Sequence, residues 1–224
     1  MKEISPLTHG LMLVFLVVVV LTTRGWGLRS SENGSGRMIG LGMIAVWIAY
    51  NAYYFHPAIF EWRTSLPLQL CDLLAIMAGV ALVWRTRIAR SFLYFSALLF
   101  AGQAIATPVG NQDPSTLRFW LYWILHAGII SCWLFDLSVR GYRPTMKDYL
   151  QVAGVELVYA AVIFPVNLAF GWNYAYIGNA QPEGATAIDW FGPWPQRVPL
   201  MILAALFLQG VMLLPWKRRR AAHR

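Results

Sequence analysis

The stretch LPLQLCDLLAIMAGVALVWRTRIAR, residues 66–90, decides the fold class of this chain. Its first 19 residues are almost wholly apolar, and a helix of that length spans about 28 Å. The hydrocarbon core of a bilayer is about 30 Å thick. Arg85, Arg87 and Arg90 follow at once. An apolar run of this length that ends in clustered arginines is typical of a membrane-spanning helix whose final end lies in the cytoplasm.

The composition of the whole chain indicates lipid as its solvent. Of the 224 residues, 58% are hydrophobic and 12% are charged, against about 45–50% and about 25% in soluble domains. The 11 tryptophans fit this reading, because Trp is enriched at membrane interfaces. The net charge of +8 lies in short loops between apolar runs rather than on a folded patch. No nucleic-acid partner is therefore predicted.

Seven apolar runs along the chain are each long enough for a spanning helix. They cover residues 7–22, 38–55, 66–84, 91–107, 117–137, 149–170 and 198–216. Transmembrane β-strands would alternate apolar and polar residues in pieces of about ten, whereas these runs are apolar on every face. We predict one transmembrane domain over residues 1–224, an all-α polytopic membrane bundle of seven transmembrane helices. The polar residues 30–36 are predicted to form a loop.

Lysine and arginine residues determine the predicted orientation. Of the 18 in the chain, 14 follow the first, third, fifth and seventh runs. Those 14 are Arg24, Arg29, Arg37, Arg85, Arg87, Arg90, Arg140, Arg143, Lys147, Lys217, Arg218, Arg219, Arg220 and Arg224. The positive-inside rule places them in the cytoplasm. We therefore predict a multi-pass protein of the cell membrane with its N-terminus outside and its C-terminus inside.

Polar side chains gather in the predicted outer parts of five of these helices. They are Asn51, Gln69, Cys71, Asp72, Gln103, His126 and Asn167, with Asn173 just beyond. A polar group in hydrocarbon is costly and marks a site or a partner. One interpretation is a cavity that opens toward the outside or the outer leaflet. The alternative is hydrogen bonding between helices, in which Asn and Gln often take part.

Cys71 and His126 form a candidate catalytic pair. Cys71 is expected about five residues into its helix and His126 about nine, at similar depths because both helices run inward. A neighbouring imidazole can take the proton of a thiol, and the thiolate can then accept an acyl group as a thioester. Asp72 or Gln69 is available to orient the ring. The alternative is that Cys71 only fills apolar space.

The face of the helix below Cys71 carries small residues, Ala75, Ala78 and Gly79. Such a face admits either an acyl chain or a closely packed neighbouring helix. Cys71 and Cys132 show no metal-binding spacing with histidine, so no metal is predicted. No nucleotide or flavin motif is present, and no cofactor is expected.

Several ordered motifs resemble the YwaF family of bacterial integral membrane proteins. They are residues 66–72, Tyr94-Phe95, Gln103-Ala104, Thr107-Pro108, residues 126–128, Asn167, Asn173-Tyr174 and residues 189–195. That family is remotely similar to an animal transmembrane ether-phospholipid acyltransferase with an intramembrane Cys and a downstream His as its proposed catalytic pair. The resemblance implies these roles for Cys71 and His126.

The expected function is lipid acyl transfer or acyl-ester hydrolysis near the outer leaflet. Cys71 is the expected nucleophile and His126 the general base, with membrane lipids as partners: an acyl-chain donor and a lysolipid acceptor. The residues expected to orient groups or bind substrate are Gln69, Asp72, Asn51, Gln103, Asn167 and Asn173. The alternative function is a non-catalytic transporter or small-ligand binder that uses the same cavity. Transporters often contain inverted repeats, and no repeat is visible here.

Overall fold

The computed structural model describes residues 4–110, 112–180, 184 and 186–216. The long helices there are α1 (Pro6–Arg29), α2 (Glu32–Tyr54), α3 (Leu70–Val83), α4 (Arg87–Ser96), α6 (Leu117–Ser138), α7 (Met146–Phe170) and α8 (Arg197–Val211). The short elements are a π-helical turn, η1 (Ala97–Ala101), the helix α5 (Gly102–Ala106) and two 3-10 turns, η2 (Tyr174–Tyr176) and η3 (Ala187–Phe191). These residues contain no strand, so the all-α prediction is confirmed for them.

Five helical stretches are long and apolar enough to cross a membrane. They are Pro6–Arg29, Arg87–Ala106, Leu117–Ser138, Met146–Phe170 and Arg197–Trp216. The second of these runs without a break through α4, the π-helical turn and α5. The chain is therefore a multi-pass helical membrane protein by the length and composition of its helices.

The helices α2 and α3 complete the seven predicted spans but are less typical of spanning helices. With 23 residues α2 is long enough, yet its apolar residues are interrupted by asparagine, glycine and tyrosine. With 14 residues α3 is only about 21 Å long, less than the hydrocarbon core. Seven spans therefore stay a prediction.

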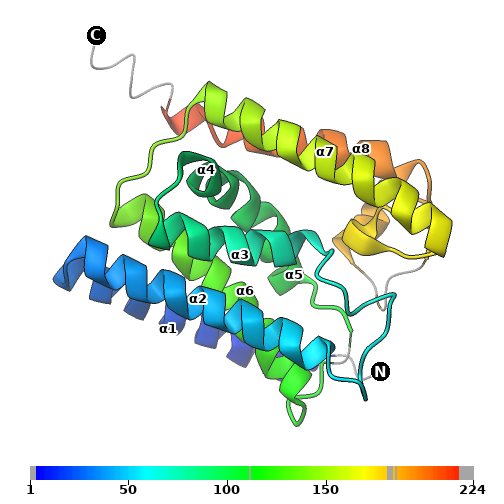
Figure 1. Ribbon diagram of the computed structural model, residues 1–224, viewed down its shortest axis with the longest axis horizontal. Coiled ribbons are helices and arrows are strands. Elements are labelled where there is room, and N and C mark those ends of the chain that lie inside the picture. The colour runs from blue at the N-terminus through cyan, green and yellow to red at the C-terminus, as the bar shows by residue number, and fades with distance from the viewer. Residues whose placement is uncertain (1–3, 111, 181–183, 185, 217–224) are drawn as a thin grey trace.

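The helices pack around a core at the centre of the bundle. In Figure 1, α1 and α2 lie along one edge, α7 and α8 along the opposite edge, and α3, α4 and α6 between them. Leu74 of α3, Phe95 of α4, and Ile129, Cys132 and Phe135 of α6 are fully buried in this core. Cys132 is therefore a packing residue.

The small-residue face of α3 packs closely against α2. A Cβ atom at Gly40 would lie 2.9 Å from the carbonyl oxygen of Gly79, and one at Gly79 would lie 2.5 Å from Ile44. Ala75 and Ala78 are fully buried. Of the two readings of this face, the structure supports helix packing, which leaves no room for an acyl chain there.

Three helices begin four or more residues away from the predicted starts: α2, α3, and α4, which begins at Arg87 rather than at residue 91. The side chain of Ser31 accepts a hydrogen bond from the N–H of Gly34 and caps α2, so residues 32–36 are helical rather than a loop. The helix α3 begins at Leu70 instead of Leu66. Tyr159 donates a hydrogen bond to the carbonyl of Leu68 and holds the preceding backbone outside the helix.

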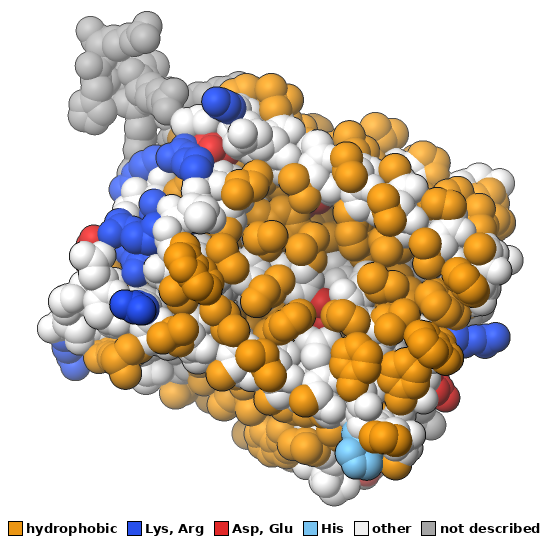
Figure 2. Space-filling model, in the orientation of Figure 1, with side chains coloured by type: hydrophobic (Ala, Val, Ile, Leu, Met, Phe, Trp, Pro, Cys, Tyr) orange, Lys and Arg blue, Asp and Glu red, His pale blue; other side chains and the backbone are white. Residues whose placement is uncertain are grey.

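One end of the bundle carries most of the arginines. Arg87 pairs with Asp148, and Arg90 pairs with Asp136 at 2.9 Å. Arg140 donates a hydrogen bond of 2.7 Å to the carbonyl of Leu82. Figure 2 shows most Lys and Arg side chains gathered at one side, with hydrophobic side chains over much of the remaining face. The cytoplasmic location of this end stays a prediction of the positive-inside rule.

Candidate functional site

Cys71 lies at the second residue of α3, not about five residues into a helix as predicted. Its thiol is free and half-buried. The first N–H groups of a helix have no acceptor within the helix, and the helix dipole is positive at this end. The dipole favours a negative charge beside this helix end, whereas burial of the thiol and the neighbouring Asp72 carboxyl oppose one on the sulfur itself.

His126 lies in the middle of α6 with 3% of its surface exposed. Its Nδ1 is 2.7 Å from the carbonyl oxygen of Tyr122, one turn earlier. A carbonyl can only accept, so Nδ1 carries the proton and the neutral ring keeps a lone pair on Nε2. No hydrogen bond to Nε2 forms within the described residues. The ring is therefore oriented as a general base requires.

Tyr122 packs on the ring of His126. Its ring centroid lies 4.3 Å from that of His126, and its hydroxyl group donates a hydrogen bond of 2.6 Å to the carbonyl of Ala104. The phenol is thus fixed between α5 and α6, beside the imidazole. Among the hydrogen bonds and ring contacts of the described residues, none joins Cys71 to His126.

Asp72 is a buried carboxylate with an unsatisfied oxygen. The residue is 5% exposed, and its Oδ1 has no hydrogen-bond partner in the described part of the chain. Native proteins seldom leave a buried polar atom unpaired. Asp72, the residue after Cys71, is therefore a candidate to bond a ligand.

Three of the predicted orienting residues hold the loop after α7 in place. The Oε1 atom of Gln69 accepts a hydrogen bond of 2.9 Å from the N–H of Ala175. Both amide atoms of Asn167 bond the backbone of Tyr174, at 2.9 and 3.0 Å. Asn173 bonds the backbone of its own loop. The loop after α7 is thereby joined to the start of α3.

Tyr174 completes this junction from within the loop. It is fully buried, and burial raises its pKa to about 12. The neutral hydroxyl donates to the carbonyl of Trp62 at 2.9 Å and accepts from the N–H of Leu66 at 3.2 Å. The segment that leads into α3 is therefore held by a side chain more than a hundred residues away.

The other two predicted orienting residues bond within their own helices. Asn51 donates to the carbonyl of Trp47 at 2.9 Å, and Gln103 donates to the hydroxyl of Thr107 at 2.8 Å. Neither bond is made to Cys71 or His126. Within the described residues, no three His, Cys, Asp or Glu side chains come close enough to hold a metal ion.

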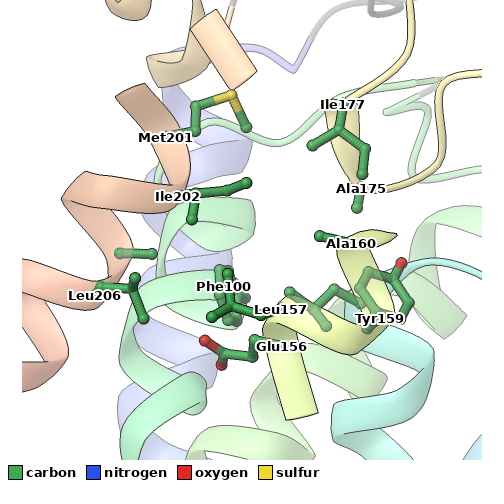
Figure 3. Close-up of a pocket in the computed structure, with 12 residues that line it drawn as sticks. Phe100, Glu156, Leu157, Tyr159, Ala160, Ala175, Ile177, Met201, Ile202 and Leu206 are labelled. Atoms are coloured by element: carbon green, nitrogen blue, oxygen red, sulfur yellow. The ribbon is translucent and has the colours of Figure 1, made fainter. Parts of the chain in front are cut away.

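A groove lies beside this region, between α7 and α8. About 570 Å³ of space free of protein atoms lies in and in front of it, part of which is open to the surroundings. Its walls are Leu70, Phe100, Glu156, Leu157, Tyr159, Ala160, Ala175, Ile177, Met201, Ile202, Ala205 and Leu206. In Figure 3 the side chains of α7 and α8 face one another across the space, with Ala175 and Ile177 at one end and Glu156 at the other. The lining is apolar except for Glu156 and Tyr159.

Glu156 belongs to a polar cluster at that end of the groove. It accepts hydrogen bonds from the hydroxyl of Ser96 at 2.8 Å and from the amide of Gln209 at 2.9 Å. Ser96 directly precedes the π-helical turn, a feature common at functional sites. The cluster joins α4, α7 and α8 inside the apolar part of the bundle.

Sequence reasoning missed the tyrosines and the groove for different reasons. Tyrosine near a span end usually marks the membrane interface, so Tyr50, Tyr122 and Tyr159 carried no signal of a site. Glu156 did carry one, since an acidic residue inside an apolar run is unusual. The groove itself depends on how α7 and α8 face each other, which no local pattern encodes.

Comparison with known proteins gives one match. No curated protein and no solved structure matches the chain significantly. The family model described as the TMEM164 family matches residues 3–213, nearly the whole chain. This family is a transmembrane one, which agrees with the apolar helices. The expected resemblance to the YwaF family stays a prediction, whereas the chain belongs to the TMEM164 family.

Proposed function

We propose that this membrane protein is a lipid acyltransferase or acyl-ester hydrolase with Cys71 as nucleophile and His126 as general base. Two features, one on α3 and one on α6, support the proposal. One is a free thiol at the N-terminus of α3. The other is an imidazole whose Nδ1 is bonded to a carbonyl, which leaves Nε2 as the basic atom. Covalent catalysis by cysteine needs both.

The reaction begins when Nε2 of His126 accepts the proton of the Cys71 thiol. The sulfur attacks the carbonyl carbon of a lipid ester, the ester C–O bond breaks, and the lysolipid leaves as an alcohol with the proton from the imidazolium. The acyl group remains on Cys71 as a thioester. A lysolipid hydroxyl, or water in hydrolysis, then gives its proton to His126 and attacks the thioester. The thiolate that leaves recovers that proton.

Donors for the developing oxyanion are available around the sulfur. The N–H groups of Leu70 and Cys71 lie in the first turn of α3, where a helix supplies no acceptor, whereas those of Asp72 and Leu73 bond the carbonyl of Gln69. The amide nitrogen of Gln69 extends from the residue that caps this helix, while its oxygen is occupied by Ala175. Asp72 supplies the unpaired polar atom that a substrate headgroup or hydroxyl can bond.

Sulfur and Nε2 are not hydrogen-bonded to each other in the described structure. Catalytic hydrogen bonds are often long without substrate and tighten in the complex. The transport alternative needs free polar groups for a solute. Asn167 and Gln103 are hydrogen-bonded within the protein, so their side chains are not free to bind a solute. The acyl reaction does not require them to be free.

The proposal is tested by labelling purified, detergent-solubilised protein with a maleimide that carries a long alkyl chain. We expect labelling of Cys71 at neutral pH that slows strongly in His126→Asn. The asparagine amide keeps a donor for the Tyr122 carbonyl but removes the basic nitrogen. Cys71→Ala should lose the label, and Cys132→Ala should keep it.

Labelling of Cys71 at the same rate in wild type and His126→Asn would contradict the proposal, because the imidazole then does not activate the thiol. Binding of a polar solute that survives Cys71→Ala would favour the transport function instead. Circular dichroism and size-exclusion profiles of each variant show whether the fold is kept.

A further inference from the structure

The groove between α7 and α8 has the chemistry of an acyl-chain site. Leu157, Ile202 and Leu206 form its sides, and Ala160 and Ala205 leave the space between the helices open. Leu157 is 45% exposed at the outer surface of α7. The groove therefore opens sideways toward lipid, from which a chain can enter without crossing water.

The groove is shorter than one lipid leaflet. Its α7 lining runs from Glu156 to Ala160 and its α8 lining from Met201 to Leu206, which is about 6–8 Å along each helix at 1.5 Å per residue. One leaflet of the hydrocarbon core is about 15 Å thick. We call the end at Ala175 and Ile177 the outer end and the end at Glu156 the inner end (Figure 3).

The inner end of the groove is closed by polar groups. Glu156 is held there by Ser96 and Gln209, and Gln209 is fully buried with its Oε1 unpaired. A methylene chain cannot extend through such a cluster without burying polar groups against hydrocarbon. The cluster therefore sets a maximum chain length.

The outer end of the groove adjoins the candidate nucleophile. Leu70 lines the groove and is the residue before Cys71. Tyr159 also lines it and bonds the carbonyl of Leu68, three residues before Cys71. A chain in the groove with its carboxyl end outermost therefore brings its carbonyl carbon toward the sulfur.

We infer that this groove binds the fatty acyl chain of the lipid substrate. The carbonyl end lies at Cys71 and the methyl end stops at the Glu156 cluster. This inference rests on the proposed function for the carbonyl end, while occupancy of the groove by a chain does not require catalysis.

The test uses a phosphatidylcholine whose acyl chain ends in a photoactivatable diazirine, in nanodiscs of dioleoyl phosphatidylcholine. Ala205→Trp fills the groove, and Leu203→Trp adds the same side chain on the lipid face of α8, where Leu203 is 62% exposed. Cross-links are mapped by peptide mass spectrometry. Thermal unfolding shows that each variant is folded.

We expect cross-links at Phe100, Leu206 or Leu157, lowered about tenfold in Ala205→Trp through lost contacts and unchanged in Leu203→Trp. The same cross-links should form in Cys71→Ala. Equal cross-linking in the two Trp variants, or cross-links spread over the lipid-facing residues of α8, would overturn the inference. Groove cross-links together with a Cys71 that never reacts would keep the chain site and reject the catalytic pair.

Discussion

At the residue scale, the hydrogen bond between His126 and Tyr122 determines what the imidazole can do. It fixes Nδ1 as the donor and leaves Nε2 as the basic atom. Asp72 is in the opposite situation, because one of its oxygens is buried with no donor. Residues that serve a function often lower the stability of the folded protein.

Asp72→Asn tests this view of the carboxylate. Removing an unpaired buried charge should raise Tm by about 2–4 °C, equivalent to about 1 kcal/mol in a chain of this size. The same variant should lower lipid acyl transfer. Both quantities are measured on protein in the same detergent, by thermal unfolding and by product formation.

Asp148→Asn is the matched control. Asp148 pairs with the half-exposed Arg87 and forms a capping box with Thr145, so its loss should cost about 2 kcal/mol. A fall in Tm for Asp72→Asn as large as that for Asp148→Asn would show that Asp72 is structural.

At the scale of single elements, glycine substitutions in α2 test how closely this helix packs against α3, the helix that carries Cys71. In Gly40→Ala the new Cβ would lie 2.8 Å from Val83 and 2.9 Å from the Gly79 carbonyl, so Tm should fall. Gly42 of the same helix has no atom within 4 Å of such a Cβ. There Ala should raise Tm, because Gly is about 1 kcal/mol less favourable in a helix. Equal shifts in the two variants would contradict this packing.

The end of the groove gives a second test at this scale. Glu156→Ala removes the side chain that closes it and should shift acyl preference toward longer chains, measured with a series of phosphatidylcholines. Val158→Ala is the control on α7, since Val158 is 66% exposed to lipid. A preference that is the same in both variants would show that Glu156 does not limit chain length.

Element boundaries show where local sequence stops being informative. The apolar runs predicted all five of the helices that are long and apolar enough to span. The start of α3 was wrong by four residues, because Tyr159 and Ala175 bond Leu68 and Gln69 from about a hundred residues away. That difference moved Cys71 to a helix N-terminus and changed its chemistry.

At the scale of the whole molecule, the arginines at one end of the bundle underlie the predicted orientation. In a Cys71→Ala, Cys132→Ala background, Ser30→Cys should react with a membrane-impermeant maleimide only after cells are permeabilised. Thr64→Cys should react in intact cells. Both positions are exposed on the protein surface. A difference in labelling therefore reports the side of the membrane on which each cysteine lies. The reverse pattern would invert the topology and place Cys71 near the inner leaflet.

The candidate site was only partly predictable from the sequence. Cys71, His126 and Asp72 stood out because polar residues are rare in apolar runs. Cys71 and Asp72 lie together at the start of α3, and His126 lies on α6 against Tyr122. Asn167 and Asn173 stood out for the same reason but bond the backbone of the loop after α7. The groove between α7 and α8 depends on which sides of the two helices face each other. Tertiary packing determines that orientation, so local sequence does not predict it.

The most direct test of the central claim is the intact mass of the protein after incubation with palmitoyl-oleoyl phosphatidylcholine without a lysolipid acceptor. We predict that wild type and Cys132→Ala gain one acyl group, released by hydroxylamine as a thioester should be, and that Cys71→Ala gains none. An acyl group carried by Cys71→Ala, or lipid acyl transfer by that variant at the wild-type rate, would contradict the account.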